Sequence, residues 1–324
     1  MTQTRRPMPP PLKMPAPGLW RRTPPAIFPP IFGLFGLGLG WRAAGSVTGD
    51  ILLGGVTLLF LFALVAYLAK PLRRPGVLIE EMRVLPGRAG LAAASLSLML
   101  MAASLAPIAP RLAMVTGFVA FALHLGLVGL LVFVLRRAPP EGRVVTPVFH
   151  LSFVGFIVGG VVANALGYPQ VATFLLWSML LPAGVIWGIS ARQLVQRTPP
   201  APLRPLLAIH LAPACLFAIV AHGAGLEAAA MGFSAVAAVI FAALILSLRW
   251  LTQSGFSALW GAFTFPLAAF ASALMLVSQP QSIPGLIGLG VLFCATPIVV
   301  IIAFRIFKMW ASGTLAAKTN AAEA

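Results

Sequence analysis

The sequence predicts an all-α membrane protein that crosses the bilayer many times. Hydrophobic residues make up 60% of the 324 positions and charged residues only 9%, with a mean hydropathy of +1.00, whereas soluble globular domains carry about 25% charged residues. The apolar stretches also reach the roughly 20 residues that a bilayer-spanning helix needs. Because no polar block long enough to fold alone interrupts them, we expect one membrane domain over residues 27–310.

Ten apolar segments follow one another, separated by clusters of proline, glycine and charge. The shortest separation is between the third and fourth, where Pro107 and Pro110 bracket a tight turn; eight or nine spans result if one segment is re-entrant. The predicted spans are residues 27–45, 50–69, 89–108, 113–135, 147–166, 170–191, 204–221, 226–248, 256–277 and 284–307.

Both ends of the chain have the composition of tails. Residues 1–26 are proline-rich and basic, and this stretch is too long before the first apolar run for a cleaved signal peptide. We expect a disordered cytoplasmic tail there, and a C-terminal cytoplasmic tail of the same kind over residues 311–324.

The basic residues predict the orientation. With ten spans, 20 of the 22 Lys and Arg fall on the side that holds both termini, and only Arg42 and Arg111 fall on the other. Positive residues concentrate on the cytoplasmic side of membrane proteins, so we expect a multi-pass protein of the bacterial inner membrane with both termini cytoplasmic. The net charge of +16 is spread over several loops, which argues against a nucleic-acid partner.

Ionisable residues are scarce inside the predicted spans. The acids are Asp50, Glu80, Glu81, Glu141, Glu227 and Glu323, all expected in loops, tails or span ends. Ion-driven carriers generally need an ionisable group within the membrane. His124 and His210 lie in spans, each without a partner at helical spacing, so hydrogen-bonded core imidazoles are favoured over proton relays.

Motifs of enzymes and cofactor sites are missing. The chain has no HExxH, no phosphate-binding lysine loop, no GxSxG and no paired acidic clusters. Cys215 and Cys294 lie far apart in apolar segments and predict buried thiols, not a metal or disulfide pair. We therefore expect neither an enzyme nor a bound metal or cofactor.

Proline and glycine recur in the odd-numbered spans. Pro29, Pro147, Pro213 and Pro266 lie in the first, fifth, seventh and ninth, and proline bends a helix and frees a carbonyl. Bent odd-numbered helices around an aqueous path are one interpretation; ordinary kinks are the other, because even-numbered spans contain proline too. The glycines allow the same two interpretations, a pore lining or close helix packing, and the candidates are Gly33, Gly36 and Gly155.

Four stretches follow one another along the predicted membrane domain: Phe28–Leu37 leading to Trp41-Arg42, Thr146-Pro147 with Phe153–Gly155, Leu203–Pro213, and Trp260–Leu267. In this order they resemble the tellurite-resistance/C4-dicarboxylate transporter family, which includes the plant guard-cell slow anion channels. The third span lacks the mid-helix proline that a regular fivefold kink pattern would have, and the segment of His210 and Cys215 departs from that of many relatives.

The resemblance implies a ten-helix bundle of five hairpins about a quasi-fivefold axis. The odd-numbered helices line a central pore, and the subunits form homotrimers in membrane lipid. In this family a phenylalanine on the ninth helix closes the pore. Phe265, just before Pro266, matches it, and Phe263 is the competing candidate on another face of the helix.

From these observations we expect passive permeation of small anions through a neutral pore that Phe265 closes. Inorganic oxyanions such as tellurite, or dicarboxylates such as malate, are the implied solutes. A carrier that exports a dicarboxylate or oxyanion by alternating access is the alternative, although the chain shows no two-half symmetry of the kind such carriers have. A membrane scaffold without transport is the third.

Overall fold

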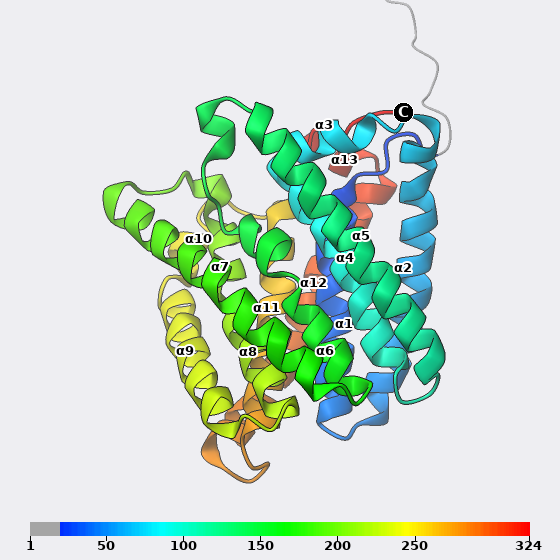
Figure 1. Ribbon diagram of the computed structural model, residues 1–324. Coiled ribbons are helices and arrows are strands. Elements are labelled where there is room, and N and C mark those ends of the chain that lie inside the picture. Colours follow the sequence, from blue (N-terminus) through cyan, green and yellow to red (C-terminus); the bar gives the residue numbers. More distant parts are fainter. Residues whose placement is uncertain (1–19) are drawn as a thin grey trace, which may run out of the picture.

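The computed structural model describes residues 20–324, which form helices and no strand (Figure 1). Nine helices in this part of the chain are long and apolar enough to cross a membrane. They are η1–α1 (Pro25–Ala43), α2 (Val47–Arg73), α4 (Leu85–Leu105), α5 (Pro110–Arg137), α7 (Pro169–Gln196), η4–α8 (Ala201–Gly223), α9 (Glu227–Leu246), η5–α11 (Ala258–Val277) and α12 (Ile283–Ala311).

The fifth predicted span is shorter than the others. It consists of a π-helical turn, η3 (His150–Val154), and α6 (Ile157–Ala165), and together they form an apolar helix of fewer than 18 residues. Pro147 lies just before this segment, at a helix start, where proline is tolerated because the missing N–H would have no partner within the helix. The remaining elements are short: α3 (Val77–Arg83), η2 (Pro140–Arg143), α10 (Leu248–Leu251) and α13 (Thr314–Lys318).

Burial alternates along the chain. Between 61% and 83% of the residues in the most apolar stretches of η1–α1, α4, η4–α8 and η5–α11 are buried, against 11% to 33% in α2, α5, α7, α9 and α12. The second group exposes large apolar side chains such as Phe118, Phe174 and Phe304. In a membrane protein such faces contact lipid or a neighbouring subunit, so the chain has an inner and an outer set of helices.

The inner helices form a closed ring. Going round it, α1 packs against α4, α4 against α6, α6 against α8, α8 against α11, and α11 against α1. Each outer helix packs against the inner helix that precedes it in the chain: α2 on α1, α5 on α4, α7 on α6, α9 on α8 and α12 on α11. Figure 1 shows α1, α4, α6 and α11 in the middle of the bundle, with α2 and α9 at its edges.

Two acids predicted in a loop lie on a helix. Glu80 and Glu81 belong to α3, and Glu81 is only 1% exposed. Its Oε1 accepts a hydrogen bond from Lys70 Nζ at 2.5 Å, and the same ammonium donates to the carbonyl oxygen of Thr23 at 2.9 Å. Burial raises the pKa of the Glu81 carboxyl, and Lys70 opposes that shift. This buried ion pair ties the end of α2 to α3 and to the segment before α1.

Both ends of the described chain contain residues that pack against the helix bundle. Residues 311–324 include α13, on which Leu315 is fully buried, and the backbone N–H of Ala322 donates to Glu81 Oε1. At the other end the chain is buried from Thr23 onward and enters η1 at Pro25. Residues 1–19 of the predicted tail lie outside the described residues.

Candidate functional site

Three cavities lie at successive levels of the inner ring. The first has a volume of about 40 Å³ and is lined by residues at the starts of the inner helices, among them Pro29, Pro86 and Leu206. The second, of about 20 Å³, is lined by residues further along them, including Val154 and Pro213. The third, of about 230 Å³, is lined by residues near their other ends. The ring therefore encloses a row of spaces along its axis.

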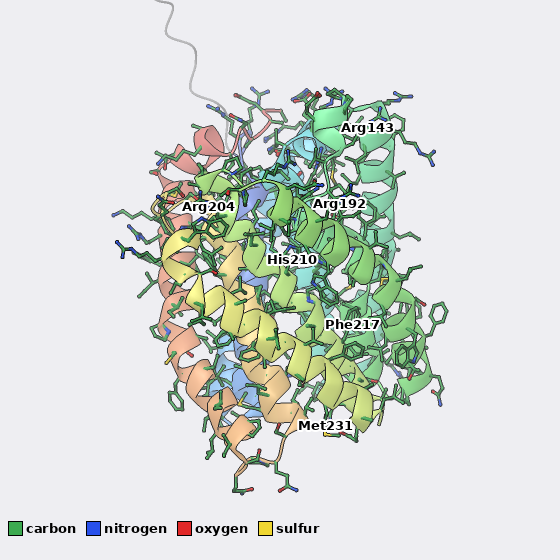
Figure 2. The ribbon with its side chains drawn as sticks, turned by 90° about the vertical axis from the view of Figure 1, so that its left-hand side faces the viewer. Arg143, Arg192, Arg204, His210, Phe217 and Met231 are labelled. Carbon is green, nitrogen blue, oxygen red and sulfur yellow. The ribbon has the colours of Figure 1, made fainter. Side chains whose placement is uncertain are left out.

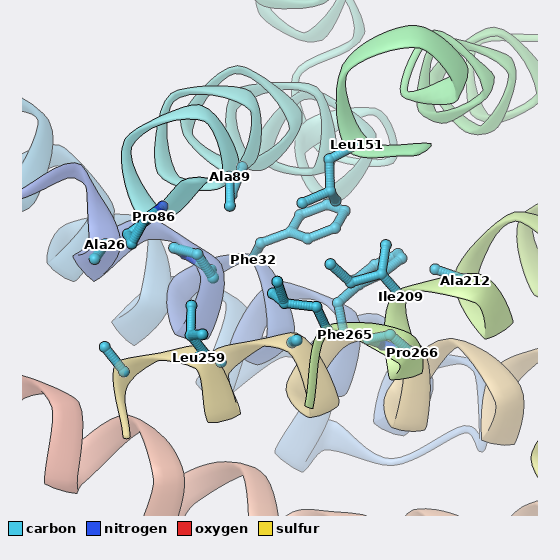
Figure 3. Close-up of a pocket in the computed structure, with 16 residues that line it drawn as sticks. Ala26, Phe32, Pro86, Ala89, Leu151, Ile209, Ala212, Leu259, Phe265 and Pro266 are labelled. Atoms are coloured by element: carbon cyan, nitrogen blue, oxygen red, sulfur yellow. The ribbon is translucent and has the colours of Figure 1, made fainter. Parts of the chain in front are cut away.

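Phe265 lines all three cavities. It is 5% exposed, and its ring stacks on that of Phe32 from α1, with centroids 3.7 Å apart and planes at 20°. Figure 3 shows both residues at the first cavity, with Leu151 and Ile209 approaching from η3 and η4. The two stacked rings separate the inner spaces, since Phe32 also borders the first and second cavities.

Phe263, the competing candidate, points elsewhere. It lines an apolar groove of about 360 Å³ that α11 forms with α9 and α12 on the outside of the ring, and its ring packs edge-on against Trp260. Two residues along a helix rotate a side chain by about 200°, which accounts for the opposite positions. The structure thus places Phe265, not Phe263, on the axis.

The proposed proline positions divide into two groups. Pro29 lines the first cavity, Pro213 the second and Pro266 the first. Pro147 is not among the described residues that line the three axial cavities. Its place before η3 gives it a backbone role, because it starts the one inner segment that begins with a π-helical turn.

The proposed glycines serve close packing as well as lining. An added Cβ on Gly33 would overlap the side chain of Thr264, so this glycine lets α1 contact α11. A Cβ on Gly36 would lie 2.9 Å from Cδ2 of Phe265, and Gly36 also lines the third cavity. Gly155 lines the second cavity, and a Cβ there would lie 2.8 Å from Nε2 of His124. Gly33 therefore lies at a helix contact, whereas Gly36 and Gly155 also border cavities.

The wall of the third cavity includes a charged side chain. Arg42 lines it, and the expectation of a wholly neutral path does not hold at this end. The guanidinium is paired with Asp50 of α2, through Nε at 2.7 Å and Nη2 at 2.6 Å, and its Nη1 donates to the carbonyl oxygen of Ser104 at 2.8 Å. These bonds join the α1–α2 turn to the end of α4.

The histidines differ from one another. His124 is fully buried, with Nδ1 bonded to Ser95 Oγ and Nε2 to the carbonyl oxygen of Ser152, which is the predicted core imidazole. His210 is not single, because its Nδ1 lies 2.9 Å from Nε2 of His150, which lines the second cavity. His150 was not among the predicted site residues, although it lies three residues after Pro147 in an inner span, a position that could have identified it.

The ends of the row of cavities differ electrostatically. The first cavity is lined by the starts of α1, α4, η4 and α11, and the third by residues toward their ends. These helices run in parallel, so their positive dipole ends surround the first cavity. Figure 2 shows Arg143 and Arg204 near that end of the bundle and Met231 near the opposite end.

The walls of the first two cavities are almost entirely apolar. No group of three or more His, Cys, Asp or Glu that could hold a metal occurs in residues 20–324. The first two cavities are lined by aliphatic, aromatic, proline and glycine residues, with His150 as the one ionisable side chain among the described residues that line them. Such walls bind a polar solute weakly, which allows it to leave as readily as it arrives.

Comparisons with known proteins agree with this architecture. No curated protein matches the chain. The family model described as voltage-dependent anion channel matches residues 22–307, which include every inner and outer helix from α1 to most of α12. Members of this family transport anions across membranes and are not enzymes. The chain therefore belongs to the voltage-dependent anion channel family, which includes the tellurite-resistance transporters and plant slow anion channels that its motifs resemble.

Proposed function

We propose that the protein is a channel in which ten spans, arranged as five hairpins, surround a pore that Phe265 closes. The observation that carries this proposal is that the buried phenyl ring of Phe265 borders all three axial cavities. The circular set of contacts among the helices α1, α4, α6, α8 and α11 supports it, because these helices share the axis as their common interior. The η3–α6 segment acts as the short fifth span.

Small anions are the solutes that the charges favour. Helix N-termini surround the first cavity and basic residues such as Arg143 and Arg204 lie near that end of the bundle, and none of the inner helices carries an Asp or Glu in the described chain. A cation would meet no compensating charge on this path. Inorganic oxyanions such as tellurite, chloride-like anions and C4-dicarboxylates such as malate fit the sign of the field, and dehydration cost selects among them.

The setting follows from the same features. The protein resides in a bacterial inner membrane, with both termini cytoplasmic, so that its basic end faces the cytoplasm. Its outer helices expose apolar grooves, one of about 510 Å³ between α5, α6 and α7. Membrane lipid and neighbouring subunits of a homotrimer occupy such faces.

The test compares Phe265→Ala with Phe263→Ala. The two phenylalanines lie on one helix, but the second faces the outer groove, so it controls for loss of an aromatic side chain from α11. In planar bilayers or oocytes we expect Phe265→Ala to increase anion conductance and Phe263→Ala to behave as the parent. An inserted, trimeric Phe265→Ala protein with unchanged current contradicts the gate.

Current recordings together with a flux assay distinguish a channel from a carrier. Unitary current steps indicate a channel. Electrically silent counterflow of anions in proteoliposomes indicates alternating access. A protein that passes no anion even as Phe265→Ala is a scaffold.

A further inference from the structure

The His150–His210 pair has hydrogen-bonding groups that the protein does not use. Nε2 of His150 and Nδ1 of His210 are 2.9 Å apart, with the rings at 86°. The other ring nitrogen of each, Nδ1 of His150 and Nε2 of His210, is buried without a partner. A buried polar group without a hydrogen-bond partner destabilises the folded protein. Two such groups on adjacent side chains point to a ligand that is bound there.

His150 brings the pair to the axial path. It is 3% exposed and lines the second cavity together with Phe32 and Phe265. That cavity has a volume of about 20 Å³, and a space of about 10–15 Å³ on this measure holds one water molecule. The ligand is therefore about the size of one water molecule or one monatomic anion.

Counting protons shows what the pair can become. Two neutral imidazoles have two N–H groups, one of which lies in the shared hydrogen bond. One unpartnered nitrogen is then a donor and the other a bare acceptor. A single added proton makes both outer nitrogens donors and leaves the shared bond intact, whereas a second proton would put two N–H groups face to face. The pair thus accepts one proton and one positive charge.

That charge has no carboxylate to neutralise it. The elements around the pair are α4, α5, α7, η4, α8, α10, η5 and α11, and none of them contains an Asp or Glu in the described sequence. Trp187 of α7 packs on His150 and donates to the carbonyl oxygen of His210 at 3.1 Å. The titratable and charged groups of these elements are Arg88, Arg111, His124, Arg136, Arg137, Arg192, Arg204, Cys215, His222 and Arg249.

We propose that the singly protonated His150–His210 pair binds a small monatomic anion, such as chloride, beside Phe265. The anion accepts the N–H of His150 Nδ1 and supplies the negative charge that the surrounding helices lack. Unpaired buried charge is costly, so proton and anion bind together. This inference rests on the proposed function and predicts that permeation increases as the pH falls.

The experiment measures chloride efflux from proteoliposomes, with Phe265→Ala as the background so that the path is open. As the pH falls from about 7.5 to about 4.5, a range that reaches well below the usual titration of histidine, we expect efflux to rise about threefold or more. His150→Gln and His210→Gln should each abolish the rise, because glutamine does not titrate. His222→Gln is the control: this histidine is paired with Glu227 on an exposed surface away from the cavity, and the rise should persist.

A direct measurement accompanies the flux. In nanodiscs of the unmodified protein with ¹⁵N-labelled histidine, chloride should shift two imidazole signals at the lower pH and none at the higher. Absence of that shift overturns the proposal. Because this measurement uses the unmodified protein, it decides the question even if a histidine variant fails to fold. Efflux that rises equally in His150→Gln also overturns it. No chloride efflux from Phe265→Ala at either pH counts against the channel itself, whereas pH-independent efflux counts against the histidine site alone.

Discussion

Arg42 and Asp50 form a charge pair whose two members should affect anion permeation in opposite directions. Arg42 lines the third axial cavity, where its guanidinium is 27% exposed, and Asp50 beside it is 60% exposed. With both present the net charge at this mouth is zero. Asp50→Asn leaves an unpaired positive charge there, and Arg42→Gln leaves a negative one.

The size of the effect follows from Coulomb's law. An anion about 8 Å from the freed guanidinium, at an effective dielectric constant of about 40, gains about 1 kcal/mol, or about fivefold in local occupancy. Asp50→Asn should therefore increase anion flux at low substrate concentration by about fivefold. Arg42→Gln should decrease it by a similar factor. Both effects should shrink at high ionic strength, because exposed charges are screened within about 10 Å at 0.1 M salt.

The assay is the initial rate of anion uptake into proteoliposomes at about 10 mM and about 1 M inert salt, conditions that differ in screening length. Asp50→Asn keeps the hydrogen bond from Arg42 to the carbonyl oxygen of Ser104, so α1 and α4 remain joined. A change in the uptake rate of this variant therefore reports the charge and not the loss of that contact. Glu227→Gln, which neutralises an exposed carboxylate that pairs with His222 at another loop, serves as a matched control. Rates that change in the same direction for both members of the pair, or that do not depend on salt, refute the electrostatic reasoning.

Three further predictions concern stability. Gly33→Val should lower the thermal midpoint in detergent, because its side chain would overlap α11, whereas Gly54→Ala faces open space and should be neutral or stabilising by up to about 1 kcal/mol. Glu81→Gln should destabilise by about 3–5 kcal/mol, because it leaves a buried lysine unpaired; replacing both partners by apolar residues should recover most of the loss, and equal loss in single and double variants would contradict this. The Arg74 hydrogen bond holds the pKa of Glu80 below its usual 4.5, so its contribution is present above that pH and disappears as the pH falls; a Glu80→Gln protein should show a shallower acid-side decline of the thermal midpoint, and parallel curves would exclude the effect.

Hydropathy and charge were sufficient to locate the helices. Apolar length and the proline and charge clusters between spans are local properties of the chain, so α2 or α5 could be predicted within a few residues. Their lipid-facing surfaces need only be apolar, and that requirement is visible in composition.

Contacts between distant segments could not be predicted from these local properties of the sequence. The stacking of Phe32 on Phe265 and the pairing of His150 with His210 depend on which face of each helix points inward. Inner helices are apolar on every side, so hydrophobic periodicity carries no information about their rotation. Phe265 was predicted as a site residue through the family resemblance. Arg42 entered the sequence analysis as one of the two basic residues on the less basic side of the membrane, and its position at a cavity was not predicted.

The burial of Glu81 could not be predicted from the sequence for a different reason. Two adjacent acids after a basic cluster are typical of a solvated loop, and nothing in the local sequence distinguishes Glu81 from Glu80. The distinction arises because Lys70, from the last turns of α2, and Ala322, from the end of the chain, converge on one carboxylate. Burial of an ion pair is decided by tertiary structure, which a reading of local pattern does not contain.

The distribution of polar groups along the axis constrains how an anion passes. Charge is confined to the two ends, and the middle holds stacked rings with one imidazole pair beside them. An anion that reaches the middle loses water, and among the described residues that line the first two cavities the proposed N–H of His150 is the one side-chain donor that would replace part of that hydration. Moving the Phe265 ring opens space but adds no donor, whereas protonating the pair adds a donor but no space. The two changes should therefore be interdependent: the loss from His150→Gln should be largest while the cavity is narrow and smaller in Phe265→Ala, where water can follow the anion through.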